Sequence, residues 1–204
     1  MDDITRSAIA QHLVKQWPNH QSKIERWTKG PVAQAMPDLR VIVLSPIGTG
    51  GPWVYVTSGA NEVDVGATYG IEFFLLSRNY EPQHVELLSL VTYMHRDPRH
   101  HLDVGHTMNL GRPWENNSNC DRLLVSLPFC AGPSFEILHL PNGGHVRFLW
   151  IIPITPLEES FRHREGLEAL ESRLEKARVD VTNPKRPSII EGELSAAAPT
   201  RTAN

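Results

Sequence analysis

The sequence has little cysteine, little net charge and no long hydrophobic run. Two of the 204 residues are cysteine, and 20 basic residues against 23 acidic ones leave a net charge of −3. This near balance excludes a general nucleic-acid binder and a polybasic membrane binder. The longest apolar run, Phe148 to Ile154, contains a proline and is far shorter than the roughly 20 residues of a membrane-spanning helix.

The first residues and the two cysteines indicate the compartment. Met1-Asp2-Asp3 is acidic and polar, so the N-terminus lacks the basic and apolar regions of a secretory signal. Cys120 and Cys130 flank a predicted strand, which would hold them roughly 30 Å apart, whereas a disulfide needs Cα atoms about 4.4–6.8 Å apart. We therefore expect a cytoplasmic protein with two reduced thiols.

Apolar alternation and turn residues predict a sheet of several strands. Asn142-Gly143-Gly144 is a strong signal for the turn of a hairpin, and the glycines after Pro46 are typical of a wider turn between two strands. The predicted strands cover residues 39–45, 53–57, 69–77, 107–110, 123–129, 135–140 and 146–152.

Helices are predicted at both ends and between strands. Ile9, Leu13 and Trp17 recur every four residues after Asp3, which can cap a helix, and a second short helix is expected over residues 21–27. Another helix begins at Pro82 and ends by residue 97. A capping box over residues 155–158 begins a helix that we expect to break near Gly166.

This pattern predicts an α+β fold with a mostly antiparallel sheet flanked by helices. Three segments are expected along the chain. Residues 1–30 form an N-terminal helical arm, residues 31–190 form the domain, and residues 191–204, which lack apolar periodicity, form a disordered tail.

The search for catalytic chemistry centres on histidines 95, 100, 101 and 106. A zinc site usually includes a local pair such as H-x-x-x-H on a helix, and this region has none. The glycines at 48, 50 and 51 lack the Lys-Ser/Thr of a phosphate loop. We therefore predict no catalytic residue, no metal site and no cofactor.

Glu72 and several aromatic residues are the other candidates for function. Glu72 is a lone charge in an apolar strand, so it lies either on the exposed face or buried with an arginine or histidine partner, and exposed alternation is the simpler interpretation. Trp53, Tyr55, Tyr69 and Trp114 cluster around predicted loops. Such aromatic residues anchor protein partners at surface grooves, although core packing explains most tryptophans.

Four motifs, in order, resemble the suppressor of fused domain over roughly residues 39–187. They are Trp53-Val54-Tyr55-Val56-Thr57-Ser58-Gly59, Tyr69-Gly70-Ile71-Glu72-Phe73-Phe74-Leu75, Gly105-His106-Thr107 with Leu110-Gly111, and Ile152-Pro153-Ile154 followed by Glu159 and Gly166-Leu167-Glu168-Ala169-Leu170. The resemblance implies an α+β domain that binds proteins and has no established catalytic activity. The predicted partner contacts are five residues of these motifs, Trp53, Tyr55, Tyr69, Glu72 and His106, together with Trp114.

The resemblance also implies a biological role, because single-domain members look bacterial and are associated with immunity to polymorphic toxins. We expect a non-enzymatic, cytoplasmic protein that occludes the active surface of a toxin domain. The alternative is a regulator or adaptor that captures a short peptide by strand addition. A third hypothesis is that the protein is a metal-dependent hydrolase that uses the His95–His106 region. The sequence leaves the partner's identity and the oligomeric state open.

Overall fold

The computed structural model describes residues 1–60, 69–141 and 143–190. The strands are β1 His20–Glu25, β2 Arg40–Pro46, β3 Trp53–Ser58, β4 Tyr69–Ser77, β5 Thr107–Asn109, β6 Arg122–Ser126, β7 Ile137–His139 and β8 His145–Ile154. The helices are α1 Asp3–Gln16, α2 Gly30–Ala35, α3 Gln83–His95, α4 Pro133–Glu136, α5 Pro156–Glu165 and α6 Leu167–Lys176, with short 3-10 turns η2 Pro98–His100 and η3 Phe129–Ala131.

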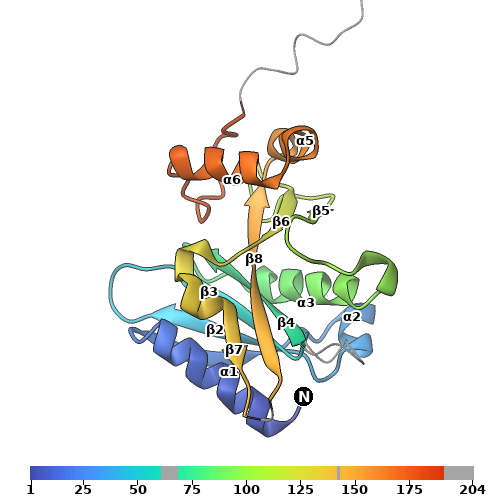
Figure 1. Cartoon of the computed structure of the whole chain (residues 1–204), viewed down its shortest axis with the longest axis vertical. Helices are drawn as coiled ribbons and strands as arrows, with labels where there is room; N and C mark the ends of the chain where they lie inside the picture. The colour runs from blue at the N-terminus through green and yellow to red at the C-terminus, as the bar shows by residue number, and fades with distance from the viewer. Residues whose placement is uncertain (61–68, 142, 191–204) are drawn as a thin grey trace, which may run out of the picture.

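The strands form one sheet of eight, in the order β1-β2-β3-β4-β8-β6-β5, with β7 beside β8. The first part of β8 pairs in parallel with β4, and its last residues pair with β6. The other pairings of the described strands are antiparallel, which confirms the predicted sheet. β8 therefore runs most of the height of the molecule and leads into α5 and α6 at its top (Figure 1).

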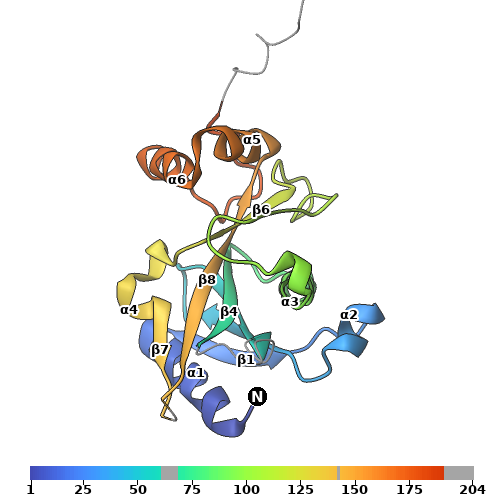
Figure 2. The same ribbon diagram turned by 45° about the vertical axis from the view of Figure 1, so that its right-hand side comes forward.

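Helices cover both faces of the sheet, with α1, α4 and α6 on one side and α3 on the other (Figure 2). Phe74 and Leu76 of β4 pack with α1 and α6 residues in one core, whereas Phe73 and Leu75 pack with α3 in the second core. A strand that is buried on both faces is apolar at successive positions. This explains the nearly continuous apolar run in β4.

Three local predictions are wrong. Residues 21–27 do not form a helix, because His20–Glu25 pairs along β2 as the outer strand β1. The side chain that caps α1 is Asp2, which accepts a hydrogen bond from the Thr5 N–H at 2.7 Å. Phe135 lies in α4 rather than in a strand, because Gly132 and Pro133 begin a helical turn there.

The signals for the C-terminal helices are confirmed. The Thr155 side chain accepts from the Glu158 N–H and the Glu158 side chain accepts from the Thr155 N–H, which is the predicted capping box. Gly166, at φ +94°, separates α5 from α6. Both cysteines are free thiols.

The predicted segment boundaries at residues 30 and 190 stay predictions. Within the first segment, α1 buries Ile9 and Leu13 against the sheet, and β1 extends the sheet itself. The predicted disordered tail, 191–204, and Asn142 of the predicted hairpin turn lie outside the described residues. Among the helices of the described ranges, none has the length and apolar character needed to cross a membrane.

Candidate functional site

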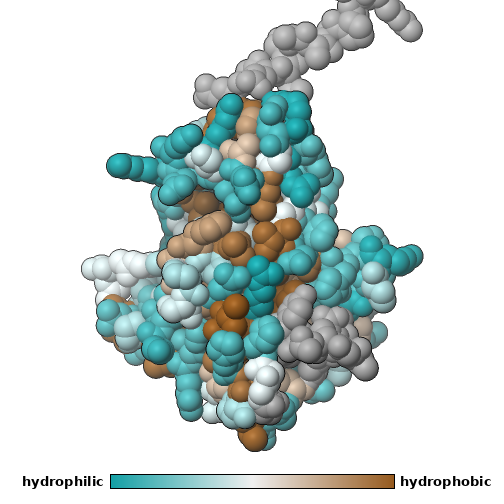
Figure 3. Space-filling view, viewed as in Figure 1, coloured by the Kyte–Doolittle hydropathy of each residue, from teal (hydrophilic) through white to brown (hydrophobic). Residues whose placement is uncertain are grey.

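A groove of about 530 Å³ lies between α6 and the upper part of the sheet. Trp150 and Ile152 of β8 line it from the sheet, and Leu174 lines it from α6. Phe129 of η3 is 61% exposed at its margin. In Figure 3 apolar surface gathers at mid-height, below the level of α6. Exposed apolar surface of this kind is typical of an interaction site.

The α6 side of the groove is acidic. Glu168, Glu171 and Glu175 all line it, because residues three, four and seven positions apart share a helix face. None of the three forms an ion pair with a residue in the described ranges. The Ser126 hydroxyl donates a hydrogen bond to Glu171 at 2.6 Å. Burial raises the pKa of Glu171, as does the nearby charge of Glu168.

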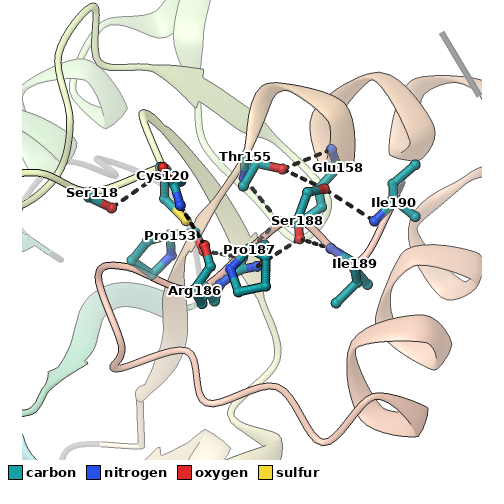
Figure 4. Close-up of polar contacts among 11 residues, drawn as sticks. Ser118, Cys120, Pro153, Thr155, Glu158, Arg186, Pro187, Ser188, Ile189 and Ile190 are labelled. Atoms are coloured by element: carbon teal, nitrogen blue, oxygen red, sulfur yellow. Dashed lines mark hydrogen bonds and ion pairs between the residues drawn. The ribbon is translucent and has the colours of Figure 1, made fainter. Parts of the chain in front are cut away.

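The segment after α6 forms the remaining wall, through Val179 and Val181. This segment is attached to the fold by Arg186, whose two terminal nitrogens each lie 2.7 Å from an oxygen of Glu158 (Figure 4). Arg186 also donates to the Pro153 carbonyl at 2.9 Å. Because both charged side chains are buried and paired with each other, the wall is held in place before any partner binds.

Glu72 does not lie on an exposed face, so the exposed interpretation is wrong. Its carboxylate is buried and accepts hydrogen bonds from the Thr57 hydroxyl at 2.6 Å and from the Gly59 and Ala60 N–H groups at 2.8 and 3.2 Å. These donors come from the end of β3 and the turn after it. Glu72 therefore fixes the start of the connection between β3 and β4.

The aromatic candidates divide between core and surface. Tyr55 and Trp114 are both buried against His84, with ring centroids 5.0 Å from its ring, Tyr55 edge-on and Trp114 stacked. Because Tyr55, Trp114 and Glu72 are all buried, their side chains are not accessible to a partner that docks on this surface. Trp53 is half-buried, 5.3 Å from the Tyr80 ring, so its contact role stays a prediction. Tyr69 begins β4, and its side chain lies outside the described part.

Two of the histidines at 95–106 accept hydrogen bonds from the backbone of the loop between them. His95 Nδ1 accepts a hydrogen bond from the Leu102 N–H at 3.1 Å, and His106 Nδ1 accepts from the Asp103 N–H at 2.7 Å. His106 is exposed, and its contact role also stays a prediction. Across the described residues, no three histidine, cysteine, aspartate or glutamate side chains are grouped so that they could hold a metal ion.

Sequence reasoning missed the groove. The spacing of the three glutamates at 168, 171 and 175 was visible as one face of a helix. The groove itself combines residues from 126–130, 150–152 and 168–181, which come together only when β6, β8 and α6 pack. No local pattern brings these three stretches to one place.

Comparison with known proteins gives the family. The family model for Suppressor of fused protein matches residues 36–187. A suppressor of fused homolog from Neisseria gonorrhoeae is 32% identical, with a TM-score of 0.78 over 92% of this chain and 97% of that chain. The structure of a Sufu-Fu complex is 16% identical, with a TM-score of 0.72 over 93% of each chain.

A third solved structure, Drosophila suppressor of fused, is 15% identical, with a TM-score of 0.62 over 93% of this chain and 54% of that chain. These last two likenesses concern the fold alone. No curated protein sequence matched the chain. The family match spans most of the chain, and the Neisseria homolog matches nearly all of it, so the chain belongs to the suppressor of fused family.

Proposed function

We propose that this protein binds another protein, without catalysis of its own, through the groove beside α6. The carrying observation is the groove itself, which has an apolar floor, a wall attached by a buried ion pair and an exposed phenylalanine at its margin. Apolar anchors within a charged rim are typical of protein interfaces. A protein of the same fold has been solved in a complex named Sufu-Fu, which supports a protein as the ligand.

The biological role that we propose is immunity to a toxin in the cytoplasm. A segment of the toxin domain would dock in the groove, and the body of this protein would then cover the toxin's active surface. Binding by occlusion needs complementary shape and charge but no reacting group on this chain. The groove supplies both an apolar contact and a charged rim.

Removing the Phe129 ring tests the groove. The ring is largely exposed, so Phe129→Ala should leave the fold intact and weaken partner binding by about tenfold or more, as loss of an anchor side chain does. Tyr93→Ala is the matched control, because Tyr93 is 42% exposed on α3, away from the groove lining.

The partner for this test is to be sought among the genes beside this chain's gene, as the C-terminal toxin module of a large protein. Binding is measured by calorimetry, and protection by growth of cells that express the module with each variant. Loss of binding and rescue with Phe129→Ala alone supports the proposal. Equal binding by Phe129→Ala and wild type would remove the groove from it, and a wild-type chain that neither binds nor rescues would remove the immunity role.

Strand addition to the sheet edge is the second candidate. β1 pairs with β2 and is the last strand of the described sheet, and its Ile24 is 67% exposed. An open edge of this kind can accept an extended peptide. Ile24→Lys places a charge on that edge, so it should weaken a strand-adding peptide and leave groove binding unchanged. The opposite effects of Ile24→Lys and Phe129→Ala distinguish the two modes.

A further inference from the structure

We propose that α6 selects the partner by charge, as a ridge between two hollows of opposite sign. The groove described above lies on one flank, and a hollow of about 400 Å³ lies on the other. Ser172 lines both. The inference rests on the proposed function, since it names the chemistry of the segment that the groove receives.

The groove flank selects basic and apolar side chains. Its three glutamates carry no cation partner from the described ranges, and Glu171 is partly desolvated against the sheet. A carboxylate in that position is stabilised when a cation approaches it. A lysine or arginine from the partner would supply this charge, while neighbouring apolar side chains cover Trp150 and Ile152.

The opposite flank is basic. Arg164, Arg173 and Lys176 line the second hollow, with Glu165 as the acidic residue among its lining. The guanidinium groups of Arg173 and Arg164 lie 4.5 and 5.5 Å from the centre of the Phe161 ring, which orients them by cation–π contact. An acidic side chain is the complement of this flank.

The occupant is therefore a partner segment that crosses α6, with basic and apolar side chains in the groove and an acidic side chain over the other flank. Such a segment is held in one direction, because reversing it places like charges together.

Charge reversal on exposed positions tests the proposal without disturbing the core. The probes are two fluorescein-labelled peptides of equal length, one of leucine and lysine and the other with every lysine replaced by glutamate. They are titrated by fluorescence anisotropy against wild type, E168K/E175K and the control D3K, which reverses an exposed charge on α1, outside the lining of both hollows. Circular dichroism checks that each variant is folded.

Wild type and D3K should bind the lysine peptide more tightly than the glutamate peptide. E168K/E175K should lose about tenfold in affinity for the lysine peptide and gain affinity for the glutamate peptide, since two attractions at the rim become repulsions. If wild type and E168K/E175K prefer the lysine peptide over the glutamate peptide to the same degree, the proposal is overturned. A wild-type dimer, seen by light scattering, that both E168K/E175K and R173E/K176E dissociate would also overturn it, because a second copy would then be the occupant.

Binding of the native partner to these variants distinguishes this proposal from the proposed function on which it rests. If Phe129→Ala weakens the partner and E168K/E175K does not, the groove binds but charge does not select, and only the present inference fails. If neither variant has an effect, the groove is not the binding site and both fail. If both weaken the partner, and R173E/K176E does so too, both flanks of α6 are confirmed.

Discussion

Glu72 and Glu158 are both fully buried carboxylates, and the fold satisfies them by different means. Hydroxyl and backbone N–H donors surround Glu72, whereas Glu158 receives two hydrogen bonds from Arg186. In both cases short charge-assisted contacts offset the loss of water. These two residues therefore connect parts of the structure and are not candidates for contact with a partner.

Glu171 is a different case, because its carboxylate borders a groove that a partner can enter. Burial raises its pKa above the ordinary carboxyl value of 4.5, the charge of Glu168 adds to the rise, and the Ser126 hydrogen bond opposes it. The pKa of Glu171 is therefore higher in the folded state than in the unfolded state. The protonated carboxyl contributes fully to stability below pH 4.5, and this contribution is lost as the pH rises through the raised pKa.

Glu171→Gln should therefore remove part of the pH dependence of stability. The variant's free energy of unfolding, relative to wild type, should increase as pH rises from below 4.5 to neutral. Urea denaturation at several pH values measures this difference. Glu175→Gln is the control, since Glu175 is exposed on the same helix face. A Glu171→Gln minus wild-type difference that stays constant across this range would contradict the assigned burial.

At the scale of elements, the segment that follows α6 holds the upper part of the fold together. Leu170 and Leu174 bury α6 against the sheet. The chain after α6 then lines the groove with Val179 and Val181 before it reaches Arg186. The Ile189 N–H donates to Glu158 at 3.1 Å and continues the attachment. One buried ion pair therefore positions α5, the end of β8 and a wall of the groove together.

Arg186→Ala should destabilise the fold by about 3–5 kcal/mol, because it leaves the Glu158 charge buried without its partner. Urea denaturation followed by circular dichroism measures the loss. Arg99→Ala is the matched control, since Arg99 also pairs with a carboxylate, that of Asp97, but is 81% exposed, and water screens an exposed pair so that it contributes little to stability. Similar losses in the two variants would mean that the Arg186 pair is solvated in solution.

At the scale of the whole molecule, the net charge of −3 conceals a local separation of charge. Acidic residues line one flank of α6 and basic residues line the other, on the part of the protein above the central sheet (Figure 1). Charges at the rim of an interface act mainly on association rate and specificity. The apolar floor contributes an attraction that salt does not screen.

Salt should therefore weaken binding of the leucine–lysine peptide to wild type, because the screening length falls from about 10 Å at 0.1 M salt to about 3 Å at 1 M. In E168K/E175K the same increase should strengthen binding of this peptide, since salt then screens a repulsion between lysines. Anisotropy titrations at rising sodium chloride measure both. A salt dependence shared by the two proteins would show that charges elsewhere dominate.

Several features of this protein follow from sequence alone. The capping box at Thr155 and the glycine break at 166 are local hydrogen-bonding and backbone constraints, so residues a few positions apart determine them. The strands β2, β3 and β4 were predicted for a similar reason, since their apolar content reports burial directly. The antiparallel character of most of the sheet followed from the turns between them.

Tertiary structure decided what those local signals do not encode. β1 is a polar edge strand, so only its pairing with β2 reveals it, and the parallel pairing of β4 with β8 joins residues far apart in the chain. Glu72 is buried because the donors at the end of β3 reach it. The groove arises where β6, β8, α6 and the C-terminal segment pack, and contacts between distant segments depend on packing energy, which no short stretch of sequence contains.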